Sequence, residues 1–141
     1  MGVLVIAVAF ALSGKSTAQV QTQLDKVGLD PSSLCKVVAQ KRAVEIAYGY
    51  DPPDAHVRVV HPYGVGYTQK RYVLLFGRQV EGYSKSAESG GDVIPGWRNF
   101  RTDRIRTLAA RSESFVSIPA PSIEYKAIQE FVCRIEPAFG G

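Results

Sequence analysis

The chain has 141 residues, of which 45% are hydrophobic and 21% are charged, and its formal net charge is +4. This length has room for one domain of ordinary size, and the composition is that of a globular protein, which excludes a disordered chain. The excess of Lys and Arg favours an anionic partner such as nucleic acid, a nucleotide or an acidic membrane surface.

Val3 to Leu12 form an apolar run that is too short to cross a bilayer as a helix but suits the core of a signal peptide or a buried strand. Small residues at 16–18 could serve signal peptidase, while the usual basic residue before the apolar core is missing. Residues 1–30 are therefore predicted to be a leader, either signal-like or disordered.

The same leader fits a loose phosphate-loop pattern through Ala9, Gly14, Lys15 and Ser16. A phosphate loop needs backbone freedom to point its N–H groups at phosphate, and residues 10–13 contain no glycine. A nucleotide-hydrolysing domain is therefore disfavoured.

Residues 31–141 are predicted to form one α+β domain. Asp30 followed by Pro31 suits a helix N-cap with proline in the first turn, which predicts a helix over residues 31–40. From residue 43 apolar and polar residues alternate, which predicts strands over 43–110, and an apolar stripe at helical spacing predicts a second helix over 122–135. The expected fold is a small, strongly bent antiparallel sheet or partial barrel of about five strands with one flanking helix on each side.

Cys35 and Cys133 are the only cysteines, and they have neither CxxC nor Cys/His spacing for zinc. In an exported protein they could form a disulfide, whereas in the cytoplasm they are most simply two small core residues. The sequence leaves this choice open and predicts no metal site and no cofactor.

Residues 95–105, PGWRNFRTDRI, contain three arginines within seven positions: Arg98, Arg101 and Arg104. A Pro-Gly turn leads into an alternating strand pattern, and each guanidinium can grip a carboxylate or phosphate through two parallel hydrogen bonds. The alternative interpretation is a solvated basic edge in which one arginine pairs with Asp103.

Four segments resemble the WYL domain, a bacterial module with an Sm-like or SH3-like β-barrel core. They are VEIAY at 44–48, RVVHPYG at 58–64, RYVLL at 71–75 and RNFRTDRI at 98–105, and the last is similar to the family pattern R-x-F-R-x-D-R-I. The family's Trp-Tyr-Leu tripeptide corresponds here to Arg71, Tyr72 and Val73, so the tyrosine is kept and the tryptophan is lost.

The resemblance implies a non-enzymatic regulatory or sensor module that binds a nucleotide or single-stranded nucleic acid. Positions that match the family motifs make Tyr72, Arg98, Arg101 and Arg104 the candidate ligand-binding residues. Family members usually carry a DNA-binding helix-turn-helix before this domain, which the residues before the barrel are not expected to hold. The resemblance therefore implies a stand-alone bacterial sensor of transcription regulation, acting through a protein partner with a DNA-binding domain or as a homo-oligomer.

The residues themselves suggest two further ligand-binding candidates in the pocket wall, His61 and Tyr63. The alternative for His61 is a structural histidine, and the alternative for Tyr63 is an aromatic residue of the core. No nucleophile and base stand at a recognisable spacing, so the chain is not expected to be an enzyme.

A cytoplasmic location is predicted, and the alternative is export or membrane anchoring through Val3–Leu12. The competing functional hypothesis is an exported or envelope-associated structural or protein-interaction domain.

Overall fold

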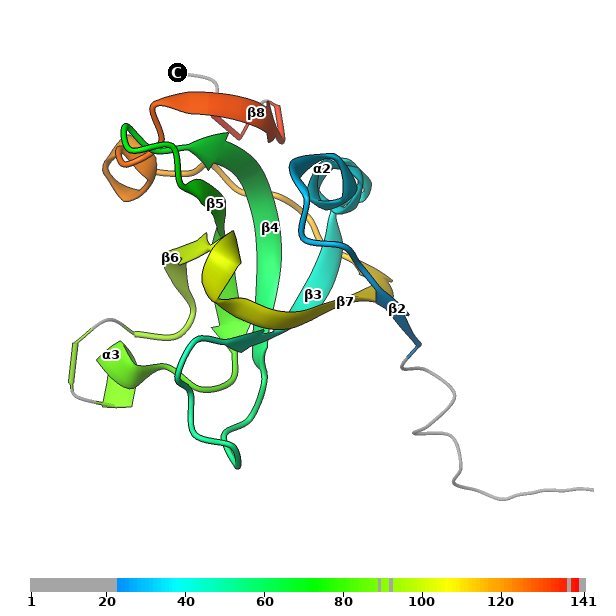
Figure 1. Cartoon of the computed structure of the whole chain (residues 1–141), viewed down its shortest axis with the longest axis vertical. Helices are drawn as coiled ribbons and strands as arrows, with labels where there is room; N and C mark the ends of the chain where they lie inside the picture. Colours follow the sequence, from blue (N-terminus) through cyan, green and yellow to red (C-terminus); the bar gives the residue numbers. More distant parts are fainter. Residues whose placement is uncertain (1–22, 89, 92, 137, 140–141) are drawn as a thin grey trace, which may run out of the picture.

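A computed structural model describes residues 23–88, 90–91, 93–136 and 138–139, and these form one antiparallel sheet of seven strands (Figure 1). The strand order is β2-β7-β3-β4-β5-β6, and β8 pairs with β4 outside this path. The strands are β2 (Leu24–Lys26), β3 (Arg42–Tyr48), β4 (Arg58–Tyr67), β5 (Val73–Glu81), β6 (Gly96–Arg101), β7 (Ile105–Ser114) and β8 (Glu130–Arg134).

One ten-residue helix, α2 (Pro31–Gln40), packs on this sheet and occupies the range that the sequence predicts. Its N-cap is Asp30, whose carboxylate accepts hydrogen bonds from the Ser33 backbone N–H at 3.0 Å and the Ser33 hydroxyl at 2.8 Å. Its buried side is formed by Leu34, Val37 and Val38. The remaining helical elements in the described residues are short: α3 (Lys85–Glu88) and the 3-10 turns η2 (Thr102–Arg104) and η3 (Ser122–Tyr125).

The predicted α+β fold of about five strands with a helix on each side is wrong, because the described chain is mostly β and has seven strands. In particular, the helix predicted over residues 122–135 is replaced by η3 and β8. The apolar stripe that suggested this helix is not buried as a stripe, since Ile123 is 62% exposed. In β8 the side chains alternate instead, with Phe131 and Cys133 less exposed than their neighbours.

The central strand β4 bends between two different partners. Residues 58–60 pair with β3, whereas residues 64–67 pair with β8. The approach of β8 depends on two glycines, because a Cβ atom on Gly64 would lie 2.9 Å from the Phe131 ring and one on Gly66 would lie 2.4 Å from an Ile128 methyl group. Figure 1 shows β8 lying across the end of β4 as a result.

The C-terminal segment covers a cluster of aromatic side chains on the sheet. Phe76 of β5 stacks on Trp97 of β6 with ring centroids 5.3 Å apart, and the rings of Tyr125 and Phe139 lie 5.5 and 5.9 Å from the Phe76 ring. In the same pairing of β5 with β6, Leu75 lies opposite Phe100, and both residues are buried.

A disulfide between Cys35 and Cys133 joins α2 to β8 across 98 residues of sequence. Of the two alternatives that the sequence leaves open, the structure has the disulfide. Among the described residues no helix is long and apolar enough to span a membrane. The predictions made for Val3–Leu12 and for the phosphate-loop pattern over 9–16 lie outside the described residues.

Candidate functional site

The three predicted arginines do not form one surface. Arg98 holds the chain that precedes its own strand: its Nη1 donates to the Trp97 carbonyl at 3.0 Å, and its Nη2 donates to the Ser84 hydroxyl and the Val93 carbonyl, both at 3.3 Å. Its guanidinium is therefore used to order the segment between β5 and β6.

Arg101 lies over Tyr72, with its guanidinium carbon 3.8 Å from the centre of the ring. Asp103 accepts from Nε and Nη2 of Arg101 at 3.0 and 2.6 Å. The pKa of Asp103 is lowered, chiefly by this hydrogen bonding and further by the positive charges of Arg101 and Arg104. The pairing with Asp103 that the sequence offered as an alternative is thus present, and Arg101 and Tyr72 are the two predicted residues that the structure brings into contact.

His61 and Tyr63 lie under the segment that follows β7. The His61 ring stacks on Phe115 with centroids 4.3 Å apart, and burial is the main cause that lowers its pKa. Tyr63 is 1% exposed, and its hydroxyl accepts a hydrogen bond from the Ile118 N–H at 2.9 Å. Both side chains are therefore engaged in packing.

A cavity of about 230 Å³, named here the Arg58 cavity, opens at one end of the bent sheet. It is bounded by the end of β3, the loop to β4, the segment after β5 and η2. Arg104 is the predicted site residue that reaches it. The lining residues are Tyr48, Gly49, Tyr50, Asp51, Arg58, Tyr83, Lys85 and Arg104.

Arg58 is 8% exposed and is held from two directions. Its Nε and Nη2 each donate to the Asp51 carboxylate at 2.9 Å, and its Nη1 donates to the Gln79 side-chain oxygen at 3.1 Å. The rings of Tyr48, Tyr83 and Phe100 lie 5.3, 5.7 and 5.7 Å from its guanidinium carbon, within the range of cation–π attraction.

These contacts do not use the whole guanidinium. The group has five N–H donors, and three hydrogen bonds to described residues leave two N–H donors without an acceptor in the described part of the chain. An unpaired polar group is costly when buried, and a guanidinium edge matches the oxygens of a carboxylate or phosphate. Arg58 is therefore suited to receive an oxyanion that enters the cavity.

Arg104 adds a second cation at the mouth of the cavity. Its side chain is exposed, and its guanidinium makes no hydrogen bond or ion pair with any residue that the structure describes. Its backbone carbonyl accepts from the Gly49 N–H at 2.6 Å, which joins η2 to the opposite wall. Since Asp51 offsets the charge of Arg58, Arg104 gives the lining an excess of positive charge.

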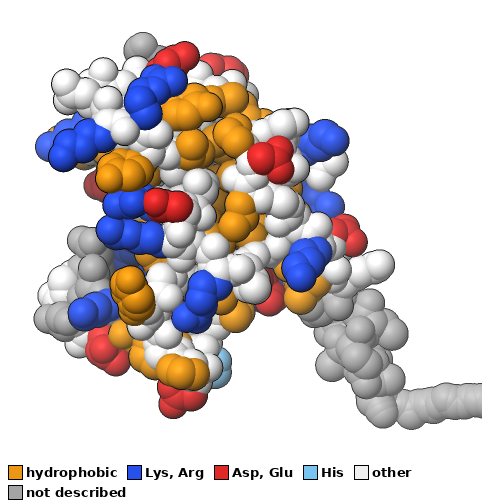
Figure 2. Space-filling model, viewed as in Figure 1, with side chains coloured by type: hydrophobic (Ala, Val, Ile, Leu, Met, Phe, Trp, Pro, Cys, Tyr) orange, Lys and Arg blue, Asp and Glu red, His pale blue; other side chains and the backbone are white. Residues whose placement is uncertain are grey.

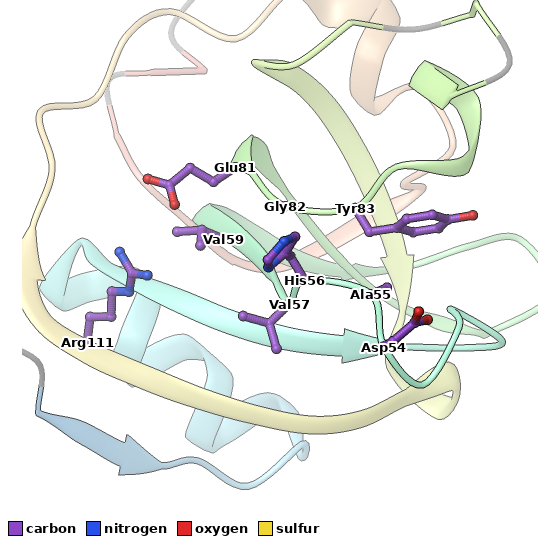
Figure 3. Close-up of a pocket in the computed structure, with 9 residues that line it drawn as sticks. All are labelled: Asp54, Ala55, His56, Val57, Val59, Glu81, Gly82, Tyr83 and Arg111. Atoms are coloured by element: carbon purple, nitrogen blue, oxygen red, sulfur yellow. The ribbon is translucent and has the colours of Figure 1, made fainter.

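A second cavity of about 430 Å³ lies on the other side of Tyr83, which lines both cavities (Figure 3). Figure 3 shows Glu81 and Arg111 on one side of it, Asp54 on the other and His56 between them. Arg111 is already paired with Glu45 at 2.9 Å, so the polar rim is on balance acidic. This cavity is therefore a poorer match for an anion than the Arg58 cavity.

Sequence reasoning missed most of the Arg58 cavity. In the sequence Arg58 is part of the RVVHPYG segment at 58–64, and its spacing of two residues from Val60 places a cation on the apolar face of a strand. Tyr48 ends β3, whereas Asp51 and Tyr83 follow β3 and β5, and nothing in the local sequence shows that these segments meet.

No group of three or more His, Cys, Asp or Glu residues in the described chain could hold a metal ion.

Comparisons with known proteins find no matching family model, no matching curated protein and no matching solved structure.

Proposed function

We propose that this protein is a non-enzymatic module that binds the phosphate of a nucleotide or of a single-stranded nucleic acid in the Arg58 cavity. The observation that carries the proposal is the buried guanidinium of Arg58, which lines the cavity with two N–H donors that have no acceptor in the described chain. Arg104 reinforces the attraction for an anion at the same place.

The size of the cavity limits what it can hold. About 230 Å³ is below the usual 300–1,000 Å³ of pockets that enclose a whole small molecule. The cavity therefore takes the phosphate-bearing part of the ligand, and the base remains at the rim. Tyr50 lines the rim and is fully exposed, so its ring is available for a base to stack on.

A second stacking surface lies close to the cavity. The Arg101 N–H donates to the hydroxyl of Tyr48, a wall residue, at 3.1 Å, and the Arg101 side chain covers Tyr72. Figure 2 shows Lys and Arg side chains gathered with some carboxylates along the side where Figure 1 has β6 and α3. Cations interleaved with aromatic rings are the pattern of single-strand binding, which favours a nucleic acid over a free nucleotide.

The motif resemblance to WYL domains supports the same class of ligand. As part of the proposal, the chain acts as a sensor whose occupied state is recognised by a protein partner.

The test is fluorescence anisotropy of labelled single-stranded DNA, single-stranded RNA and duplex DNA with the full chain over a salt series. Arg104→Gln is expected to weaken single-strand binding about tenfold and to reduce the slope of log K against log salt by about 0.7, one phosphate contact. The matched control is Arg71→Gln, which removes the same charge from the turn between β4 and β5, at the end of this hairpin away from Arg58. Arg71 pairs there with Glu130 at 3.1 Å.

Equal losses in the two variants would show binding by general charge and would contradict the proposal. If the anisotropy of all three labelled nucleic acids does not change with protein concentration at low salt, nucleic acid is excluded as the ligand.

The disulfide supports a second candidate function, an exported or envelope-associated interaction domain. Disulfides persist in oxidising compartments and are rare in the cytosol, and Cys35 and Cys133 are bonded here. Mass spectrometry of the protein from its native host, under non-reducing conditions with a thiol-alkylating reagent, tests this candidate. An unalkylated chain lighter by two hydrogens supports it, and two alkylated thiols contradict it.

A further inference from the structure

Gln79 has the most completely buried polar side chain near the Arg58 cavity, with 0% exposure. It lies on β5 opposite Val60 of β4 and Gly96 of β6. Its oxygen accepts from Arg58 Nη1 at 3.1 Å, and its nitrogen donates to the carbonyls of Glu81 and Tyr83 at 3.2 and 2.7 Å. Both amide donors are therefore used, and the single acceptor contact is made to Arg58.

The two carbonyls belong to the segment that forms the wall between the two cavities. The chain turns there at Gly82, which has φ of +98° and leaves no space for a Cβ atom, since one would lie 2.0 Å from the Val57 carbonyl oxygen. A turn of this kind directs backbone carbonyls away from the strand ladder, and they need other donors. Gln79 supplies those donors and so fixes the backbone that carries the Tyr83 ring.

We infer that Gln79 is a positioning residue of the anion site: its amide oxygen orients the guanidinium of Arg58, and its amide nitrogen fixes Tyr83 beside it. This inference rests on the proposed function. Asp51 takes one edge of the guanidinium and Gln79 takes Nη1, so the plane of the group is held from two sides. The N–H donors left over are thereby kept in one orientation for a phosphate, at no cost of reordering when the ligand binds.

The test compares Gln79→Met, which keeps the length and volume of the side chain, with Gln69→Met in the exposed turn between β4 and β5. Binding of a fluorescein-labelled oligothymidylate is measured over a salt series, with the thermal midpoint of each variant. For Gln79→Met we expect Kd to rise about tenfold and the salt slope to fall by about 0.7, because Arg58 no longer makes its phosphate contact. Gln69→Met should match the wild type in both quantities.

The salt slope separates positioning from a merely structural role. A variant that only lowers the fraction of binding-competent protein raises the apparent Kd in inverse proportion to that fraction and leaves the slope unchanged. An unchanged slope in folded Gln79→Met would therefore overturn the inference. If the wild type and the Arg104→Gln variant behave as proposed while Gln79→Met binds normally, only the role of Gln79 is lost; if the wild type does not bind, the proposed function itself has failed.

A measurement on the wild type covers the case in which Gln79→Met does not fold. In a nitrogen-15 NMR spectrum, separate Nη1 and Nη2 signals for Arg58 are expected, because Asp51 and Gln79 each hold one of these nitrogens. A single averaged signal would show a freely rotating group and would overturn the inference.

Discussion

Asp103 binds Arg101 through both of its carboxylate oxygens, at 3.0 and 2.6 Å, while the same guanidinium lies over the Tyr72 ring. The acid thus occupies the edge of the guanidinium that a phosphate would use. Arg101 presents a flat stacked surface beside the Arg58 cavity, but its charge is offset by a neighbour two residues away.

Replacing Asp103 with Asn should therefore strengthen binding of single-stranded nucleic acid. We expect Kd to fall several-fold and the salt slope to steepen by about 0.7, because one more phosphate contact becomes available. The matched control is Glu136→Gln, which releases Arg134 from a similar pair at 2.6 Å on β8. Equal gains in both variants would mean that any freed arginine suffices.

Asp51→Asn should destabilise the fold. The ion pair that it breaks is almost enclosed, with side-chain exposures of 9% for Arg58 and 12% for Asp51, and loss of one partner leaves a buried cation without its counterion. The expected loss is about 3 kcal/mol of unfolding free energy, measured by urea denaturation. Glu130→Gln breaks the exposed pair with Arg71, where both side chains are more than 60% exposed, and should cost less than about 1 kcal/mol. Similar losses in the two variants would contradict this account.

The elements that sequence reasoning identified correctly are those specified by local signals. Helix α2 begins where Asp30 and Pro31 predict, because capping and proline geometry depend on neighbouring residues alone. The predicted helix over 122–135 failed because its residues form β8 through contacts made far away in the sequence. Those contacts are the pairing with the Gly64–Gly66 stretch of β4 and the disulfide to Cys35, and they outweigh a helical spacing of apolar residues.

The same distinction applies to the candidate site. The pairing of Arg101 with Asp103 could be foreseen because the two residues are separated by one position. The Arg58 cavity could not, since it needs the β3–β4 loop, the segment after β5 and η2 to converge. That convergence follows from the order and bend of the strands, which no single segment reveals.

Gly66→Asn should destabilise the protein where Gly49→Asn does not. A Cβ atom at Gly66 would lie 2.4 Å from an Ile128 methyl group and 2.7 Å from the backbone oxygen of Glu130, so β8 would have to move. The expected cost is about 1–3 kcal/mol in urea denaturation. Gly49 has φ of +49°, which asparagine tolerates, and apart from its two neighbours in the chain no described residue has an atom within 4 Å of its Cβ position. A destabilised Gly49→Asn with a normal Gly66→Asn would show that β8 does not pack on β4 as described.

His61 should make stability fall as the pH is lowered. Its pKa in the fold is below the ordinary value of 6.5, first because of burial and then because of Arg78, with Glu113 acting in the opposite direction. The unfolded chain therefore binds a proton more readily than the folded one, so the stabilisation present above about pH 6.5 is lost as the pH falls toward the folded pKa. His61→Phe keeps a ring against Phe115 and removes the titration. Thermal midpoints measured between about pH 8 and pH 5 should drop more in the wild type than in this variant, and parallel curves would show that His61 is not the group responsible.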